Sequence, residues 1–225
     1  IDGWRLDQAY QVPVNYWDDI VAAVHSASQS VTYTDANHQT VNPLGYMVAE
    51  IWRGESDISA QAYGTSQQPS LSSAFDFPLR YRLVQTLAVE ESGAGKSPAS
   101  NLRLGYQTQQ AYPAHAMPNL MLGNHDLVRF GDLVQRAGLA NPTDASYWSR
   151  HKAAISFLAA YSGPITLYYG DEIGQEVPGY ATRVEAGCVT LGYCDDHVAR
   201  SSAVIEGLPP TVGASVSVLT PEQAD

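Results

Sequence analysis

The sequence predicts an α/β fold in which parallel strands alternate with helices. Two observations carry this prediction. Apolar segments of strand length alternate along the chain with segments of helical periodicity, and the strand-like segments are continuously apolar. Continuous apolar runs are typical of parallel strands that helices cover on both faces, whereas strands with one wet face alternate apolar and polar residues. The 225 residues suffice for one ordinary domain or at most two small ones.

The first part of the chain contributes two of these strands and one helix. We expect a short strand over residues 1–6, a helix that opens near Pro13, and an apolar strand over 44–52. The helix is indicated by apolar side chains at helical spacing, namely Tyr16, Trp17, Ile20, Val21 and Val24. Residues 26–43 and 56–70 are polar and rich in turn-forming residues, so we expect loops there, with one helical turn in the second.

The same alternation continues through the second part of the chain. In order, we expect a strand over 74–78, a helix over 79–89, a linker over 92–99, a strand over 118–126, a helix over 147–161 and a strand over 165–170. Beyond residue 174 the pattern gives way to loop. We therefore divide the chain into residues 1–174, which hold the strands and helices, and a loop-rich segment over 175–225.

Charge and composition narrow the class of ligand. The chain has 12 Lys and Arg against 23 Asp and Glu, and a net charge of −11 would repel nucleic acid and acidic membrane surfaces. The longest apolar stretch, over 153–161, is about half of what a membrane-spanning helix needs. Charged residues make up only 16% of the chain, below the roughly 25% of soluble domains, so the surface suits a neutral polar ligand.

Three of the predicted strands end in acidic or polar side chains. Asp7 follows the first strand, Glu50 lies near the end of the second, and Asn124-His125-Asp126 closes the strand over 118–126. Ligands of α/β folds bind at the carboxyl ends of the strands, so we expect these side chains to line one site. Carboxylates gathered in this way serve either divalent-metal binding or glycoside cleavage.

Four segments resemble the α-amylase family of glycoside hydrolases (family 13), and they occur in the family's order. They read DGWRLD at residues 2–7, VAEIW at 48–52, LGNHD at 122–126 and GPITLYYGDEIG at 163–174. In the family these segments belong to strands four, five, seven and eight of a catalytic TIM (β/α)8 barrel. Four motifs in the correct order are a specific signal, whereas one alone is weak. The resemblance implies that residues 1–174 are the C-terminal part of the barrel, with strands four to eight.

The resemblance also implies a role for each matching residue. Asp7 would be the nucleophile, Glu50 the general acid and base, and Asp126 the residue that stabilises the transition state. Arg5, two residues before Asp7 and on the same face of the strand, would orient Asp7. The further residues expected to contact substrate are Asn124, His125, Arg129 and Trp52.

The implied activity is hydrolysis of α-glucosidic bonds in starch-like or malto-oligosaccharide substrates, with retention through a double displacement. A transglucosylase or sucrose-acting member of the family would share the same acids. A non-catalytic relative that binds carbohydrate and an unrelated metal-dependent barrel hydrolase are further alternatives. Calcium is a cofactor of many family members, but this chain has no counterpart of the family's D-x-x-x-N-H segment. Tyr10 and Gln11 also stand where Lys-His is usual, so no calcium ligands can be assigned.

An eight-stranded barrel takes about 250 residues, and strands four to eight alone cannot close it. We therefore expect the missing N-terminal half-barrel to come from upstream sequence or from a separate polypeptide. The two cysteines, Cys188 and Cys194, could close a small disulfide loop, stay reduced, or bind zinc with His197. The disulfide would indicate a periplasmic or secreted protein.

Overall fold

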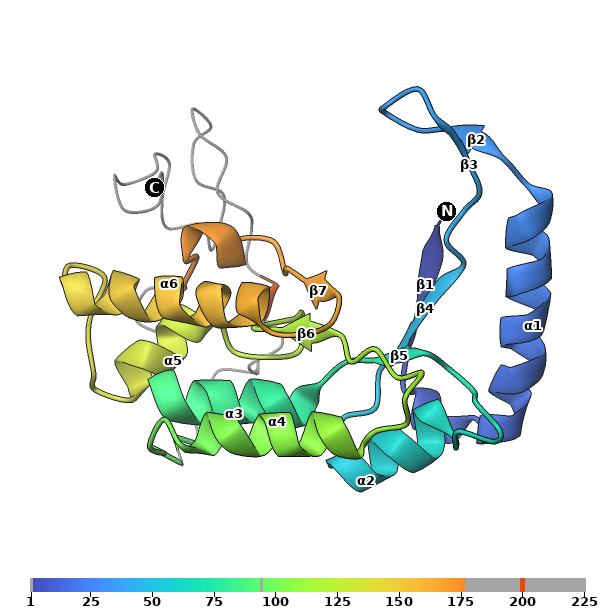
Figure 1. Cartoon of the computed structure of the whole chain (residues 1–225). Helices are drawn as coiled ribbons and strands as arrows, with labels where there is room; N and C mark the ends of the chain where they lie inside the picture. The colour runs from blue at the N-terminus through green and yellow to red at the C-terminus, as the bar shows by residue number, and fades with distance from the viewer. Residues whose placement is uncertain (1, 94, 177–198, 201–225) are drawn as a thin grey trace. The chain divides into compact units, whose positions relative to one another are not determined.

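The structure, a computed structural model, describes residues 2–93, 95–176, 199 and 200 (Figure 1). The chain forms two compact units, and each has its own hydrophobic core. The first unit comprises Ile1–Pro78, Tyr106–Asn119 and Ser162–Pro164. The second comprises Leu79–Gly105, Leu120–Tyr161 and Ile165–Asp225.

The first unit is built on a three-stranded parallel sheet in the order β1-β4-β5, with β4 in the centre. The strands are β1 (Gly3–Leu6), β4 (Tyr46–Ala49) and β5 (Ser73–Ala74). In the register of the sheet, Leu6 pairs with Ala49 and Ala49 pairs with Ala74. The parallel arrangement predicted from the continuous apolar runs is confirmed here. The expected strand over 74–78 is wrong in its extent, because Phe77 already begins α3 (Phe77–Leu87).

A long helix and a hairpin connect β1 to β4. The chain turns through the short helix η1 (Ala9–Gln11), and α1 (Val14–Ser30) follows Pro13, whose fixed backbone angle suits a helix start. Trp17 of this helix is buried in the unit's core. The segment expected to be a loop over 26–43 instead ends α1 and forms an antiparallel hairpin, β2 (Tyr33–Thr34) with β3 (Thr40–Val41).

Between β4 and β5, the helical turn expected within residues 56–70 is longer than one turn. The helix α2 (Glu55–Ile58) continues directly into a π-helical turn, η2 (Ser59–Tyr63), within a segment rich in Ser and Gln. Ile58 and Ala62, four residues apart, are buried on one face of this helix together with Tyr63. The apolar face is too short to stand out among the polar residues that surround it.

The second unit contains four helices and a pair of strands within its described residues. Its helices are α3, α4 (Asn101–Ala111), α5 (Phe130–Arg136) and α6 (Ala145–Ala160), of which α3 begins and α4 ends in the first unit. The strands β6 (Leu120–Met121) and β7 (Ile165–Thr166) pair in parallel, and η3 (Asp171–Ile173) follows. The helices expected over 79–89 and 147–161 are confirmed within two residues at each end, whereas α4 and α5 were not expected.

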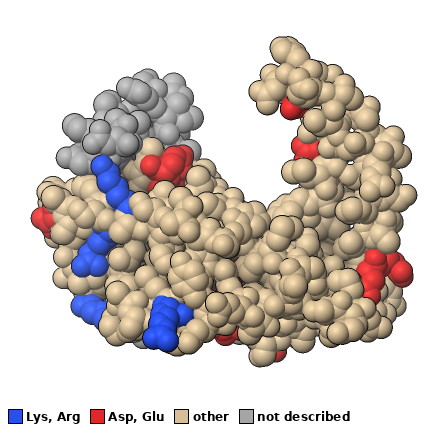
Figure 2. All heavy atoms as spheres, in the orientation of Figure 1, with Lys and Arg blue, Asp and Glu red and all other residues tan. Residues whose placement is uncertain are grey.

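Close packing of α3 and α4 depends on one glycine. A Cβ atom placed on Gly105, in the middle of α4, would lie 2.5 Å from Cδ1 of Leu79 on α3. The core of the unit, around Leu83, Leu120 and Leu158, holds these helices together. No helix within the described ranges is long and apolar enough to cross a membrane. On the face drawn in Figure 2 most of the surface is uncharged and the charged side chains are scattered.

Candidate active site

Asp7 and Glu50 lie at the carboxyl ends of two neighbouring strands. Leu6 and Ala49 are paired residues of β1 and β4, and each acid is the next residue along its chain. The two chains remain joined there, since the Glu50 N–H donates to the Leu6 carbonyl oxygen at 2.9 Å. The adjacency expected from the sequence is therefore confirmed for this pair.

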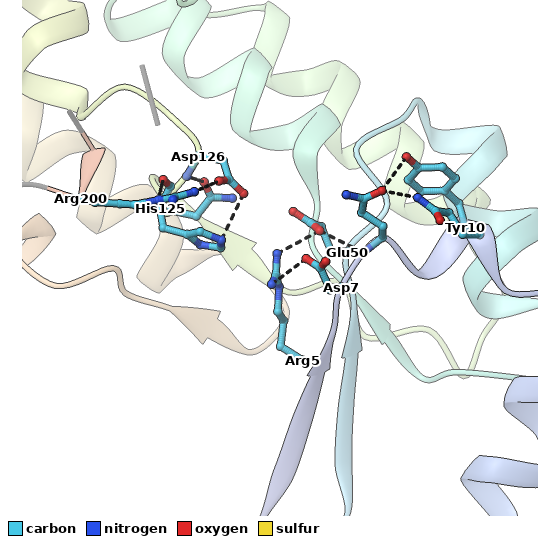
Figure 3. A network of polar contacts seen from close by, with 10 residues as sticks. Arg5, Asp7, Tyr10, Glu50, His125, Asp126 and Arg200 are labelled. Carbon is cyan, nitrogen blue, oxygen red and sulfur yellow. Dashed lines mark hydrogen bonds and ion pairs between the residues drawn. The ribbon is translucent and has the colours of Figure 1, made fainter. Parts of the chain in front are cut away.

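Arg5 bridges the two carboxylates (Figure 3). Its Nη1 lies 2.8 Å from Oδ1 of Asp7, and its Nη2 lies 2.9 Å from Oε2 of Glu50. One guanidinium thus fixes the positions of two acids, and its charge offsets the repulsion between them. The acids differ in exposure: 65% of the Asp7 side chain is exposed, but only 7% of the Glu50 side chain.

Gln8 supplies a main-chain contact to Glu50 that sequence reasoning missed. Its backbone N–H donates to Oε2 of Glu50 at 3.1 Å, and its backbone adopts the left-handed conformation with φ 42° and ψ 47°. The next N–H, from Ala9, donates to the Glu50 carbonyl oxygen at 2.9 Å. A non-glycine residue in this conformation is strained by about 1–2 kcal/mol, and such strain clusters at functional sites.

The segment Asn124-His125-Asp126 follows β6 in the second unit. Oδ1 of Asn124 accepts a hydrogen bond from the backbone N–H of Asp126 at 2.8 Å, which closes a tight turn. His125 Nε2 lies 3.2 Å from Oδ2 of Asp126. The turn therefore presents the histidine and the carboxylate together, as expected from the motif.

Arg200 completes this group (Figure 3). Its Nη2 lies 2.8 Å from Oδ1 of Asp126, and its Nε donates to the His125 carbonyl oxygen at 3.1 Å. This contact was not predicted, because Arg200 lies 74 residues after Asp126 in a segment without a motif.

Comparison with known proteins identifies the family. A sequence model of the alpha-amylase catalytic domain matches residues 1–191, most of the chain. The chain belongs to the α-amylase family. The catalytic domain of this family is a TIM barrel, which fits the parallel strand pairs in both units.

Three similar proteins show the extent of the likeness within the α-amylase family. A crystal structure of a glutamate-to-glutamine variant of AmyP in complex with maltotriose is 57% identical, with a TM-score of 0.91, over all of this chain and 44% of AmyP. Neopullulanase 2 of Thermoactinomyces vulgaris is 28% identical over 77% of this chain and 24% of its own. An α-amylase from Geobacillus thermoleovorans, 21% identical with a TM-score of 0.58, shares the fold over 88% of this chain. The chain thus spans less than half of AmyP and about a quarter of neopullulanase 2.

Arg129 and Trp52, two further residues expected from the α-amylase family resemblance, have different surroundings. Arg129 is only 2% exposed, and its guanidinium donates to the carbonyl oxygens of Tyr169 at 2.9 Å and Ala199 at 3.1 Å. This burial favours a structural role for Arg129 over contact with a sugar. Trp52 is 43% exposed and stacks on Phe77 with ring centroids 5.2 Å apart, so its use as a sugar platform stays a prediction.

A buried carboxyl group also lies beside the glycine that precedes Asn124. Asp171 is 7% exposed, and its Oδ1 lies 3.4 Å from where a Cβ atom of Gly123 would be. Burial raises the pKa of Asp171 to about 6, although the positive charge of Arg129 and the N–H of Tyr168 oppose the rise. Asp171 lies in the family-like segment over 163–174, whose resemblance implies no role for it.

The described residues contain no cluster of three or more His, Cys, Asp and Glu side chains that could hold a metal ion. Calcium, which many members of the family bind, stays a prediction for this chain. Cys188 and Cys194 lie outside the described residues, so their disulfide and the localisation inferred from it stay predictions.

Proposed function

We propose that the protein to which this chain belongs hydrolyses α-glucosidic bonds in starch-like or malto-oligosaccharide substrates, with retention of configuration. The observation that carries the proposal is the Arg5 bridge between Asp7 and Glu50 at the ends of paired strands. The names of the relatives support the substrate class, since AmyP is bound to maltotriose or maltose and other relatives are a neopullulanase and cyclomaltodextrinases.

In this mechanism Asp7 attacks the anomeric carbon while Glu50 protonates the departing glycosidic oxygen. The bond from the anomeric carbon to that oxygen breaks, and a covalent bond to Asp7 forms. Glu50, now ionised, then removes a proton from water, which displaces Asp7 and releases the sugar with its original configuration. Retention requires carboxyl groups about 5–5.5 Å apart, and two acids held by one guanidinium are compatible with that spacing.

The side-chain contacts of Glu50 with the described residues fall on one of its two oxygens. Among the described residues, both Arg5 and the Gln8 N–H contact the same oxygen, Oε2. We assign the transferred proton to Oε1. Asp126, which the family motif aligns with the third acid, would bind sugar hydroxyls and stabilise the positive charge that develops on the ring.

We further propose that this chain contributes strands four to eight of the barrel. β1, β4 and β5 would be strands four, five and six, while β6 and β7 would be seven and eight. The parallel pairing within each group supports this assignment. Strands one to three would then come from the half-barrel that the chain does not contain, and residues 175–225 would follow strand eight.

The test uses the whole enzyme with Glu50→Gln, Asp7→Asn and a control, Asp19→Asn, which removes an exposed acid of α1. Each variant is assayed on soluble starch and on maltosyl fluoride, whose leaving group needs no protonation. Both active-site variants should lose about 10²- to 10⁴-fold or more on starch. Only Glu50→Gln should still form the glycosyl intermediate from the fluoride at a measurable rate, because Asp7 remains in place.

Unchanged starch hydrolysis by Glu50→Gln, or equal behaviour of the two variants on the fluoride, would refute the assignment of roles. NMR of the first product must show the α-anomer, and a β-anomer would refute retention. Analysis of longer products separates water from a sugar hydroxyl as the acceptor. Net chain-length growth would identify a transglucosylase instead of a hydrolase.

A further inference from the structure

Arg200 contacts two consecutive residues of the candidate site at once. Its Nη2 lies 2.8 Å from Oδ1 of Asp126, and its Nε donates to the main-chain oxygen of His125 at 3.1 Å. Two N–H groups of one planar guanidinium therefore hold a side chain and the backbone next to it. Such a pair of contacts fixes orientation as well as distance, which a single ion pair does not.

Both carboxylate oxygens and the backbone N–H of Asp126 have contacts within the second unit. Oδ1 faces Arg200, Oδ2 faces His125 Nε2 at 3.2 Å, and the backbone N–H donates to Asn124. His125 and Asn124 are neighbours in sequence and move with the same turn. Arg200 connects the turn to a distant part of the chain.

The residue before Arg200 is firmly anchored. Ala199 is fully buried, and its carbonyl oxygen accepts hydrogen bonds from Arg129 Nη2 at 3.1 Å and from the Tyr168 hydroxyl at 3.2 Å. The Arg129 guanidinium also lies over the rings of Tyr168 and Tyr169. This buried cluster fixes the backbone from which Arg200 reaches Asp126. Arg129 therefore affects the site indirectly, through the position of Arg200.

The contact contributes little to overall stability. The Arg200 side chain is 49% exposed and the Asp126 side chain 26% exposed, and ion pairs at that exposure are weak because water screens them. The ion pair is weak for stability, yet Arg200 extends from a buried backbone and donates through two N–H groups. This combination points to a role in positioning.

We propose that Arg200 is a positioning residue that holds the Asp126 carboxylate in the orientation needed to stabilise the transition state. This proposal rests on the proposed function, because Asp126 has that role only in a glycosidase. The sugar ring gains positive charge as its bond breaks, and a carboxylate fixed in advance stabilises that charge without having to reorganise.

The experiment is a double-mutant cycle in the whole enzyme, with kcat and KM measured on maltotriose. Arg200→Gln removes the charge and Arg200→Lys keeps it with one donor group, while Arg103→Gln removes an exposed arginine of α4 as the matched control. Each is made alone, and Arg200→Gln is also combined with Asp126→Asn. We expect Arg200→Gln to lower kcat about 10- to 100-fold, the ratio for one charge-assisted hydrogen bond, with a smaller change in KM. Arg200→Lys should recover part of the loss.

The decisive result is the effect of Arg200→Gln when Asp126 is already Asn. A residue that acts through Asp126 has little further effect there, whereas a structural residue causes the same loss in both backgrounds. Equal losses, or an Arg200→Gln variant as active as the wild type or more active, would overturn the proposal while the proposed function stands. A wild-type enzyme that releases no sugar from any α-glucan would overturn both. Thermal unfolding midpoints show whether each variant is folded.

Discussion

His151 and Asp171 are buried titratable residues of the second unit. Burial shifts their pKa values in opposite directions, so a change in pH affects their contributions to stability in opposite ways. His151, on α6, packs against Phe130 and Tyr147 with ring centroids 5.0 Å and 4.6 Å apart. Neither of its ring nitrogens has a hydrogen-bond partner among the described residues. Burial lowers the pKa of His151 to about 4, and burial raises the pKa of Asp171 to about 6.

The sign follows from the form that the folded state prefers. His151 favours folding with its neutral ring, so its contribution is present above its ordinary pKa of 6.5 and is lost as the pH falls towards about 4. Asp171 favours folding when it is protonated, so its contribution is complete below its ordinary pKa of 3.8 and is lost as the pH rises through about 6. Each shift corresponds to about 3 kcal/mol. Between pH 4 and 6.5 the two contributions therefore oppose each other in the wild type.

Replacing one residue at a time should separate them. The assay is urea unfolding of the whole protein from pH 4 to pH 8, expressed as the free energy of unfolding of the variant minus that of the wild type, in which the other titrating groups cancel. From pH 7 to pH 4, the difference should rise by about 3 kcal/mol for His151→Gln and fall by about 3 kcal/mol for Asp171→Asn. The double variant should give a nearly level line. Any slope that remains measures coupling between the two sites.

Slopes of the same sign, or two level lines, would refute the reasoning from burial. NMR titration of the imidazole provides a direct check on the histidine. A His151 ring that gains its proton near pH 6.5 in the folded protein would show that the ring is solvated.

Three further predictions test the packing and the site. Gly131→Ala should destabilise the protein by about 1–3 kcal/mol in urea unfolding, since its Cβ atom would lie 2.0 Å from the Tyr147 hydroxyl oxygen; an unchanged midpoint would mean that Tyr147 can move aside. Leu83→Ala, at a fully buried position, should cost about 2–5 kcal/mol, and a loss below about 1 kcal/mol would contradict the packing of the second unit's core. Arg5→Lys should lower kcat/KM about 100-fold, because one ammonium cannot span Asp7 and Glu50 as the guanidinium does. The control variant Arg53→Lys should retain activity. Equal activity of the two variants would show that the bridge is dispensable.

The strands and the longer helices could be predicted from the sequence because each has a pattern that local physics explains. Continuous apolar runs predicted β4 and β6, and helical spacing of apolar residues predicted α1, α3 and α6. The helix α4 was missed because Gly105, in its middle, weakens its intrinsic helix preference. Its stability comes from packing against Leu79, which the sequence of α4 does not report.

The candidate site divides in the same way. Asp7, Glu50 and Asp126 were found because each follows a strand within a recognisable motif. Gln8 was missed because its contribution is a main-chain N–H, aimed by a left-handed conformation that glutamine does not signal. Arg200 was missed because its contact with Asp126 spans 74 residues, and only the fold brings such residues together.

The three acids differ in how firmly they are held, and the differences match the motions that the proposed mechanism requires of each. Glu50 is held at one oxygen by Arg5 and Gln8, and Asp126 is held at both oxygens by Arg200 and His125. Asp7 is the most exposed, and its contact among the described residues is Oδ1 with Arg5. A nucleophile must move towards the anomeric carbon with an oxygen that no donor occupies, whereas a stabilising carboxylate works best when it does not move. In the proposed mechanism Arg5 therefore holds Asp7 in place without preventing its approach to the sugar.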